Sequence, residues 1–249
     1  MRLVNALGVA LAMAYGMAGA AEIRLLSSTG MRSVLIEVLP EFERASGHKV
    51  AVAYDTGNLL LTRIQGGESA DVVVLTGPTM DELAKSGRVS GARVDLARSG
   101  VGVAVRAGAA KPDIRSVEAL KRALLAAKSV AYTTTGASGV YFAGLIERLG
   151  IAEQVKAKAK TQPGGTVGEL VAKGEAELAV QQIPELKAVK GVELVGPLPA
   201  EIQYYTVFPA AVLKDAKQPA AAASLVKFLT TPEVTRVMQA KGMEAAAPQ

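Results

Sequence analysis

Short apolar runs alternate along the chain with longer segments in which apolar residues recur every three or four positions. Runs rich in Val, Ile and Leu predict buried strands, and the periodic segments predict amphipathic helices. The expected strands lie at residues 23–26, 49–54, 71–75, 101–105, 129–132, 177–180, 192–195 and 204–213. The expected helices lie at residues 31–45, 59–65, 79–87, 117–127, 139–149, 167–173, 220–229 and 232–240.

Individual residues predict details of two of these helices. Thr79 and Glu82 have the spacing of a capping box, so the third helix is expected to begin there. Pro40 lies inside the apolar pattern of the first helix, where a proline removes a backbone hydrogen bond. The first helix is therefore expected to bend or to divide at Pro40.

The alternation of strands and helices predicts an α/β fold with mostly parallel strands. Two such units follow one another, and the chain crosses between them near residues 99–106 and again near residues 203–206. We expect lobe 1 to comprise residues 21–103 and 205–249, and lobe 2 to comprise residues 104–204. Because such sheets bind ligands at the carboxyl ends of their strands, a ligand cleft is expected between the lobes.

The first twenty residues have the pattern of a secretory signal peptide. Arg2 is their only charge, residues 3–14 are almost entirely apolar, and Ala18-Gly19-Ala20 has the form of a cleavage site. A transmembrane helix is the alternative, since the stretch approaches a spanning length. Residues 1–20 are therefore predicted to be a cleaved signal, and the mature chain is predicted to be periplasmic.

Composition narrows the possible functions. Removing twenty residues from the chain of 249 leaves 229, in which only a small share is aromatic, so an aliphatic core is expected. The absence of Cys excludes thiol chemistry and thiolate metal sites. The net charge of +5 is spread along the chain without a basic run interleaved with aromatics, which argues against nucleic acid as a partner. A modest positive field favours the approach of an anion.

Motifs for enzyme chemistry are incomplete. The single His48 lies in an expected turn, and Ser138 lacks the second glycine of a nucleophile elbow because Val140 stands there. Gly100-Val101-Gly102 falls in a strand rather than at a dinucleotide-binding turn, and Asp55 has no carboxylate neighbours for a metal. The sequence therefore predicts a protein that is not an enzyme, with no cofactor and no metal.

Four small turns provide a positive signal. Each is rich in hydroxyl groups or glycine, and each follows an apolar run and precedes an expected helix. They are Ser27-Ser28-Thr29-Gly30, Asp55-Thr56-Gly57-Asn58, Thr133–Ser138 and Gly164-Gly165-Thr166. Free backbone N–H groups and the helix dipole make such turns suitable for binding anions, although hydroxyls at these positions also serve as simple helix caps.

The chain resembles the type II periplasmic solute-binding proteins of ABC transporters, and among them the molybdate-binding branch. The residues that carry the resemblance run in order through the mature chain: Leu26-Ser27-Ser28, Thr56-Gly57-Asn58-Leu59, Ala70-Asp71-Val72-Val73, Ser138-Gly139-Val140-Tyr141, Gly174-Glu175-Ala176, Phe228-Leu229 and Pro232-Glu233. Gln181-Gln182 stands where that branch has a tyrosine. The resemblance implies two α/β lobes with a ligand cleft between them.

The resemblance also implies a function: capture of a small anion, with a molybdate-like or tungstate-like oxyanion favoured, for delivery to a permease by a monomeric protein. The expected ligand-binding residues are Ser27, Ser28, Thr29, Gly30, Thr56, Gly57, Asn58, Thr76, Ser138, Gly139, Thr166 and Gln182. Arg32 leaves an alternative open, because a guanidinium pairs with a planar carboxylate, so the ligand can instead be an organic acid. Less favoured alternatives are an exported α/β enzyme and a sensor-associated binding module.

Overall fold

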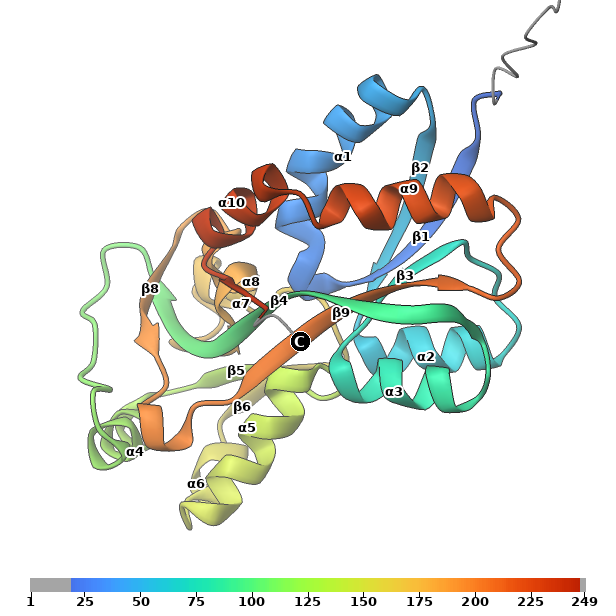
Figure 1. Cartoon of the computed structure of the whole chain (residues 1–249). Helices are drawn as coiled ribbons and strands as arrows, with labels where there is room; N and C mark the ends of the chain where they lie inside the picture. Colours follow the sequence, from blue (N-terminus) through green and yellow to red (C-terminus); the bar gives the residue numbers. More distant parts are fainter. Residues whose placement is uncertain (1–18, 247–249) are drawn as a thin grey trace, which may run out of the picture.

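The computed structural model describes residues 19–246, in which strands and helices alternate around one hydrogen-bonded sheet (Figure 1). The strands are β1 (Glu22–Ser28), β2 (Lys49–Asp55), β3 (Val72–Val74), β4 (Val89–Arg106), β5 (Val130–Thr133), β6 (Ala159–Gln162), β7 (Leu178–Gln182), β8 (Val192–Pro197), β9 (Tyr205–Leu213) and β10 (Glu244–Ala245). The α-helices are α1 (Arg32–Ser46), α2 (Gly57–Gln65), α3 (Gly77–Lys85), α4 (Val117–Ala126), α5 (Ala137–Arg148), α6 (Ala152–Lys156), α7 (Gly168–Ala172), α8 (Ile183–Lys187), α9 (Pro219–Leu229) and α10 (Pro232–Ala240). Two short 3-10 turns are η1 (Thr29–Met31) and η2 (Ala200–Ile202).

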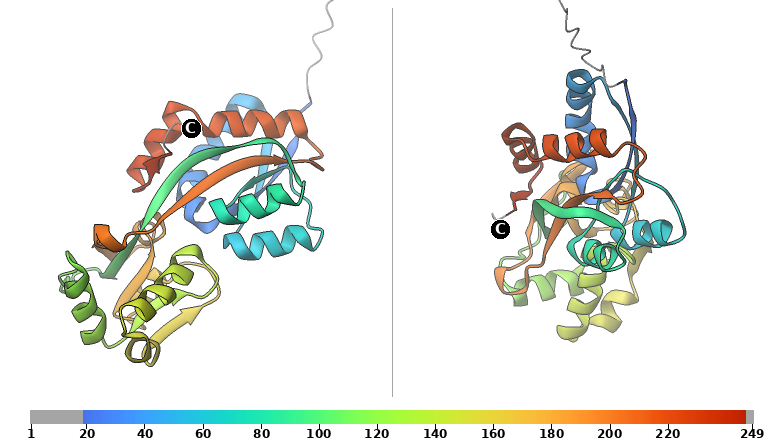
Figure 2. Two further views of the ribbon diagram at one scale, coloured as in Figure 1. Left: turned by 60° about the horizontal axis from the view of Figure 1, so that its bottom comes forward. Right: turned by 45° about the vertical axis from the view of Figure 1, so that its right-hand side comes forward.

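Two long antiparallel strands, β4 and β9, run through the middle of the molecule (Figures 1 and 2). The first part of β4 pairs with β9, whereas its last residues pair with β7 and β8. The strand order is β2-β1-β3-β9-β4-β7-β5-β6, with β8 and β10 also paired to β4. β4 therefore belongs to both halves of the sheet and connects them.

In the first half of the sheet, β1 lies between β2 and β3, and all three are parallel. Successive side chains of a strand point to opposite faces. Ile23 and Leu25 pack with α1, α9 and α10, whereas Leu26 packs with α2 and α3. Both faces are covered, which explains why these strands read as nearly continuous apolar runs.

In the second half, β5 lies between β6 and β7, again in parallel. Val130 and Val180 pack with α4, α5 and α6, and Ala131 and Ala179 pack with α7 and α8. The aliphatic cores thus fall into two groups of elements joined by β4 and β9. The expected α/β fold with a central sheet flanked by helices is confirmed, while the residue boundaries of the lobes stay a proposal.

Pro40 does not divide α1, which is continuous from Arg32 to Ser46, while a bend at Pro40 stays a prediction. Two other local expectations are wrong. The third helix begins at Gly77 after Thr76, two residues before the expected start, and the Thr79 hydroxyl bonds back to Thr76. β4 spans 18 residues rather than the five expected.

Other elements were not foreseen: α6, β6 and α8 are short and carry weak patterns. The predicted signal peptide, residues 1–20, lies outside the described residues except for its last two. Within residues 19–246, no helix combines the length and the apolarity required to cross a bilayer.

Candidate functional site

A small chamber lies where strands of both halves of the sheet end. Its volume is about 30 Å³, which is room for a group the size of one or two water molecules. The residues that line it are Ser28, Thr29, Gly30, Thr56, Gly57, Thr76, Thr133, Gly136, Ala137, Ser138, Gly165, Gln181, Gln182, Glu185, Thr206 and Phe208. Hydroxyls, amides and glycines dominate, so the chamber offers hydrogen bonds rather than an apolar surface.

The topology explains why these residue types gather. Thr133 and Gln182 are the last residues of β5 and β7, which are parallel and therefore end at the same edge of their half of the sheet. Ser28 is the last residue of β1, which runs antiparallel to them in the other half, and all three residues line the chamber. Thr56 and Thr76 stand just before α2 and α3. The first N–H groups of a helix have no partner within it, so these helix starts favour an anion in the chamber.

Three chamber side chains hold polar atoms that are buried without a hydrogen-bond partner among the described residues. They are the Ser28 hydroxyl, the Thr133 hydroxyl and the Oε1 atom of Gln182. The other end of the Gln182 amide donates to the Thr206 hydroxyl at 2.6 Å, so its orientation is fixed. Leaving a buried polar group unpaired costs about 1–3 kcal/mol. Three such atoms around one cavity are the arrangement expected of a site that binds a polar ligand.

One glycine at this edge is required by close packing. A Cβ atom on Gly139 would lie 1.7 Å from the carbonyl oxygen of Thr133, which is impossible without moving the backbone. Gly139 therefore lets the first turn of α5 approach the end of β5, which brings Ser138 and Thr133 to the same chamber.

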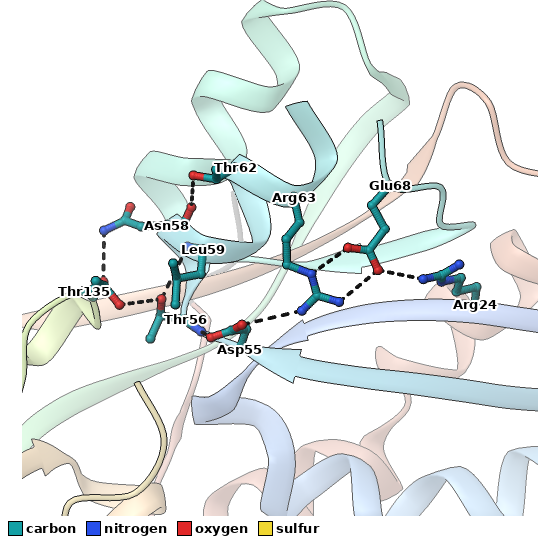
Figure 3. A network of polar contacts seen from close by, with 9 residues as sticks. All are labelled: Arg24, Asp55, Thr56, Asn58, Leu59, Thr62, Arg63, Glu68 and Thr135. Atoms are coloured by element: carbon teal, nitrogen blue, oxygen red, sulfur yellow. Dashed lines mark hydrogen bonds and ion pairs between the residues drawn. The ribbon is translucent and has the colours of Figure 1, made fainter. Parts of the chain in front are cut away.

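Contacts between the two halves close the site on one side (Figure 3). The Thr56 and Thr135 hydroxyl oxygens are 2.9 Å apart, and the Asn58 amide donates to the Thr135 carbonyl at 3.0 Å. Because the Thr135 hydroxyl donates its proton to the Pro163 carbonyl, the Thr56 hydroxyl is the donor in this pair. Residues far apart in the sequence thus hold the halves together.

An ion-pair network links the last turn of α2 to Asp55, which directly precedes Thr56 (Figure 3). Arg63 lies 3.5 Å from Asp55 and donates two hydrogen bonds to Glu68, which also accepts from Arg24. The bonds from Arg63 hold the pKa of Glu68 below its usual range. The network joins β1, β2 and α2, and thereby fixes the position of Thr56.

Glu185 is the one ionisable side chain among the residues that line the chamber. It follows β7 in the first turn of α8 and is only 8% exposed. Burial raises the pKa of Glu185 to about 8, and a hydrogen bond from the Gln182 backbone N–H opposes this rise. The carboxyl group therefore exchanges its proton close to neutral pH, unlike an ordinary carboxylate in water.

An open groove of about 790 Å³ adjoins the chamber and shares Thr29 and Glu185 with it. Four cationic residues line this groove: Arg32, Lys187, Lys190 and Lys241. Arg32 lies over the ring of Tyr54, 5.5 Å from its centre, and Lys241 pairs with Glu37 at 2.5 Å. The groove also contains Glu169, so its cations outnumber its carboxyl groups.

The structure brings together eight of the residues expected from the sequence: Ser28, Thr29, Gly30, Thr56, Gly57, Thr76, Ser138 and Gln182 all line the chamber. Five others lie elsewhere. Ser27 is buried and its hydroxyl donates to the Ser28 carbonyl, Gly139 packs against Thr133, and Asn58 contacts Thr135. Arg32 and Thr166 line the groove instead.

Eight residues that line the chamber were absent from the expected set: Thr133, Gly136, Ala137, Gly165, Gln181, Glu185, Thr206 and Phe208. Thr133 directly follows a predicted strand, so its place in a hydroxyl-rich turn was a usable signal. Glu185 lies three residues after Gln182, the spacing of a carboxyl group that caps a helix. Nothing local in the sequence indicates that Phe208, from the distant β9, reaches this site.

Comparisons with known proteins show the family. Residues 23–244 match the model of the bacterial extracellular solute-binding proteins. An aconitate isomerase from a Pseudomonas species is 37% identical over 234 residues, covering 91% of this chain and 89% of the relative. The molybdate-binding protein ModA of Azotobacter vinelandii is 27% identical, covering 97% and 96%.

Comparison with solved structures identifies proteins of the same kind. The solved structure of the Azotobacter vinelandii periplasmic molybdate-binding protein superposes with a TM-score of 0.77 at 18% identity, covering 91% of this chain and all of that chain. A match at this level of identity shows the type II periplasmic binding fold and no more.

The prediction that the chain is not an enzyme is wrong by this measure, because the relative at 37% identity is named as an isomerase. Triads, thiols and clustered metal ligands are the enzyme features that the sequence lacks. Moving a double bond in a carboxylic acid requires none of them, since one group that accepts and returns a proton is sufficient.

The match along residues 23–244 agrees with the sheet order, the two groups of core residues and the chamber between them. The chain belongs to the bacterial extracellular solute-binding protein family, as a solute-binding protein of the ABC-transporter type.

Proposed function

We propose that this chain binds a small polycarboxylate where the chamber meets the groove, and that it interconverts the cis and trans isomers of aconitate or a closely similar acid. The identity of 37% with an aconitate isomerase, along nearly the whole of both chains, supports this substrate class.

The observation that carries the proposal is the junction between the small polar chamber and the larger groove lined by cationic residues. Aconitate has three carboxylates on neighbouring carbons around one double bond. A cavity of about 30 Å³ has room for one carboxylate, whose oxygens suit the hydroxyl and N–H donors of the chamber. The remaining carboxylates would extend into the groove toward Arg32 and Lys190. A compact ligand confined to the chamber would leave these cations unused.

A tetrahedral oxyanion such as molybdate or tungstate is the second candidate. It is favoured by the chamber itself, which contains hydroxyls and helix starts but no cationic side chain, and by the likeness to ModA. In this alternative the chain would only capture the ion and deliver it to a permease.

The test is to incubate the purified chain separately with cis-aconitate and with trans-aconitate and to follow both by proton NMR. We expect the same equilibrium mixture from either side, and an increase in Tm with both isomers. Molybdate, tungstate and sulfate are compared in the same thermal assay. Absence of interconversion, together with an increase in Tm only for molybdate or tungstate, would overturn the proposal in favour of the second candidate.

Substitution of Arg32 tests whether the groove binds carboxylates of the substrate. Arg32→Ala is expected to raise KM for aconitate at least tenfold, because a charge-assisted bond to a carboxylate contributes about 1.5–3 kcal/mol. Arg44, exposed near the end of the same helix, provides the matched control, and Arg44→Ala is expected to leave KM unchanged. Equal values of KM for both variants would remove Arg32 from the site.

Location and partners follow from the family and the sequence pattern. The proposal includes export by the predicted signal at residues 1–20, a periplasmic monomer, and contact with an inner-membrane permease rather than with nucleic acid. Isomerisation and delivery are compatible, because both begin with capture of the acid between the lobes.

A further inference from the structure

Glu185 has a place that no other acidic side chain shares among the described residues. It lines the chamber and the groove at once, at the point where a bound acid would pass from one space to the other. The remaining fifteen chamber residues carry no group that ionises near neutral pH, so Glu185 alone can exchange a proton with a ligand held there.

Helix capping does not account for this choice of residue. Glu185 is the third residue of α8, and its carboxyl group accepts from the backbone N–H of Gln182, which stands just before the helix. Glutamine performs the same capping equally well, without the cost of burying a group that can carry charge. Helix capping therefore does not explain why a carboxyl group, rather than an amide, is buried beside the cavity.

We propose that Glu185 is the general base and acid that carries the proton during isomerisation. This inference rests on the proposed function and names the catalytic residue within it.

The step balances without any further reagent. The Glu185 carboxylate removes a proton from the CH2 carbon of aconitate, and the electron pair of that C–H bond forms a new double bond to the central carbon. The electron pair of the former double bond takes the proton back from Glu185 at the opposite terminal carbon. The new double bond forms in either geometry, so cis and trans isomers interconvert while the composition and the oxidation level stay the same.

The surroundings of Glu185 suit this role. Burial raises its pKa to about 8, and a catalytic group works best when its pKa lies close to the working pH. The charged groups on the elements around α8 that line the same groove are Arg32 of α1, Glu169 of α7, Lys187 of α8 itself, Lys190, and Lys241 after α10. The cations among them would hold the carboxylates of the substrate and would offset their negative charge close to Glu185.

The test compares Glu185→Gln, Glu185→Asp and the matched control Glu118→Gln with the wild type in the NMR assay. Glu118 lies exposed in the first turn of α4 and lines neither the chamber nor the groove, so it controls for loss of a helix-start carboxylate. We expect Glu185→Gln to lower kcat at least 100-fold while KM changes less than threefold and Tm does not fall. Glu185→Asp should retain part of the activity with a shifted pH profile, and Glu118→Gln should match the wild type.

Each result separates the two proposals. If the wild type interconverts no isomers, the proposed function fails. If the wild type is active and Glu185→Gln is equally active, Glu185 is not the proton carrier. A Glu185→Gln variant that raises KM at least 100-fold with an unchanged kcat would also overturn the inference, because it would assign Glu185 to binding. A kcat of the wild type that rises with one ionisation near pH 8, lost in Glu185→Gln, would support it.

Discussion

The buried carboxyl group of Glu185 makes the folded state sensitive to pH. Its pKa rises from the ordinary 4.5 to about 8 on folding, so between these values the folded chain holds a proton that the unfolded chain releases. Stability from this group is complete below pH 4.5 and is lost as pH rises toward 8. The shift corresponds to a loss of stability on the order of 5 kcal/mol.

Glu185→Gln removes that loss and is therefore expected to raise Tm relative to the wild type by several degrees more at pH 8 than at pH 5. Differential scanning calorimetry at the two pH values measures the difference. Glu118→Gln, whose carboxyl group is exposed to water, is expected to follow the wild type at both. A difference between Glu185→Gln and the wild type that does not grow with pH would contradict the assigned pKa.

The buried hydroxyls that have no hydrogen-bond partner among the described residues lead to a second prediction about single residues. Ser28→Ala removes a buried oxygen that has no partner among the described residues, so Tm should stay the same or rise while affinity for trans-aconitate falls about tenfold. Ser33, whose hydroxyl is also buried without a partner among the described residues, lines the groove but not the chamber and serves as the comparison. Ser33→Ala should affect Tm similarly and binding much less, as thermal-shift titration can measure. A loss of Tm in Ser28→Ala would show instead that its hydroxyl stabilises the fold.

The candidate site could be predicted only where short-range signals exist. Ser28, Thr56 and Ser138 follow apolar runs and precede helices, and this position alone places them at the edge of the sheet. Glu185 has an ordinary local sequence, and its chemistry comes from burial by elements distant in the chain. Burial of one side chain depends on tertiary packing, which a single sequence does not specify.

At the scale of elements, the approach of α5 to β5 depends on Gly139. Gly139→Ala would force a Cβ atom into the Thr133 carbonyl, so we expect a loss of about 1–3 kcal/mol and a weaker chamber. Gly144 lies in the same helix with only the flexible end of Arg148 near its Cβ position, at 3.4 Å. Gly144→Ala should therefore stabilise α5 by up to about 1 kcal/mol. Urea denaturation of both variants distinguishes them, and equal effects would contradict the close approach.

The elements that were not predicted from the sequence lack a clear hydrophobic pattern, for physical reasons. The first part of β4 carries Ser90, Arg93 and Arg98 and is half exposed beside β9, so it lacks a continuous apolar run. α8 has five residues with a proline at its second position, which is too short for helical periodicity. The buried strands β1, β3 and β5 were predicted because both faces of the sheet demand apolar residues there.

At the scale of the whole molecule, the two halves are joined by β4 and β9 and held by contacts across the cleft (Figures 1 and 3). A few hydrogen bonds between exposed and half-buried groups contribute little free energy each, so closure is expected to be easily reversible. Such a balance suits a protein that admits a solute, encloses it and releases it. Ligand contacts from both halves would then shift the population toward the closed form.

Asn58→Ala tests this balance, because it deletes the amide that bonds to the Thr135 carbonyl and leaves the Asn58 backbone bond to Thr62 in place. We expect an open form to become more populated, with a larger radius of gyration by small-angle X-ray scattering. Affinity for trans-aconitate should fall about three- to tenfold, since the competent closed form is rarer. Thr62→Ala is the matched control: its hydroxyl bonds only within α2, so it can weaken the helix without opening the cleft. If Asn58→Ala had the radius and the affinity of the wild type, this contact would not contribute to closure, and the lobes would be held mainly by β4 and β9.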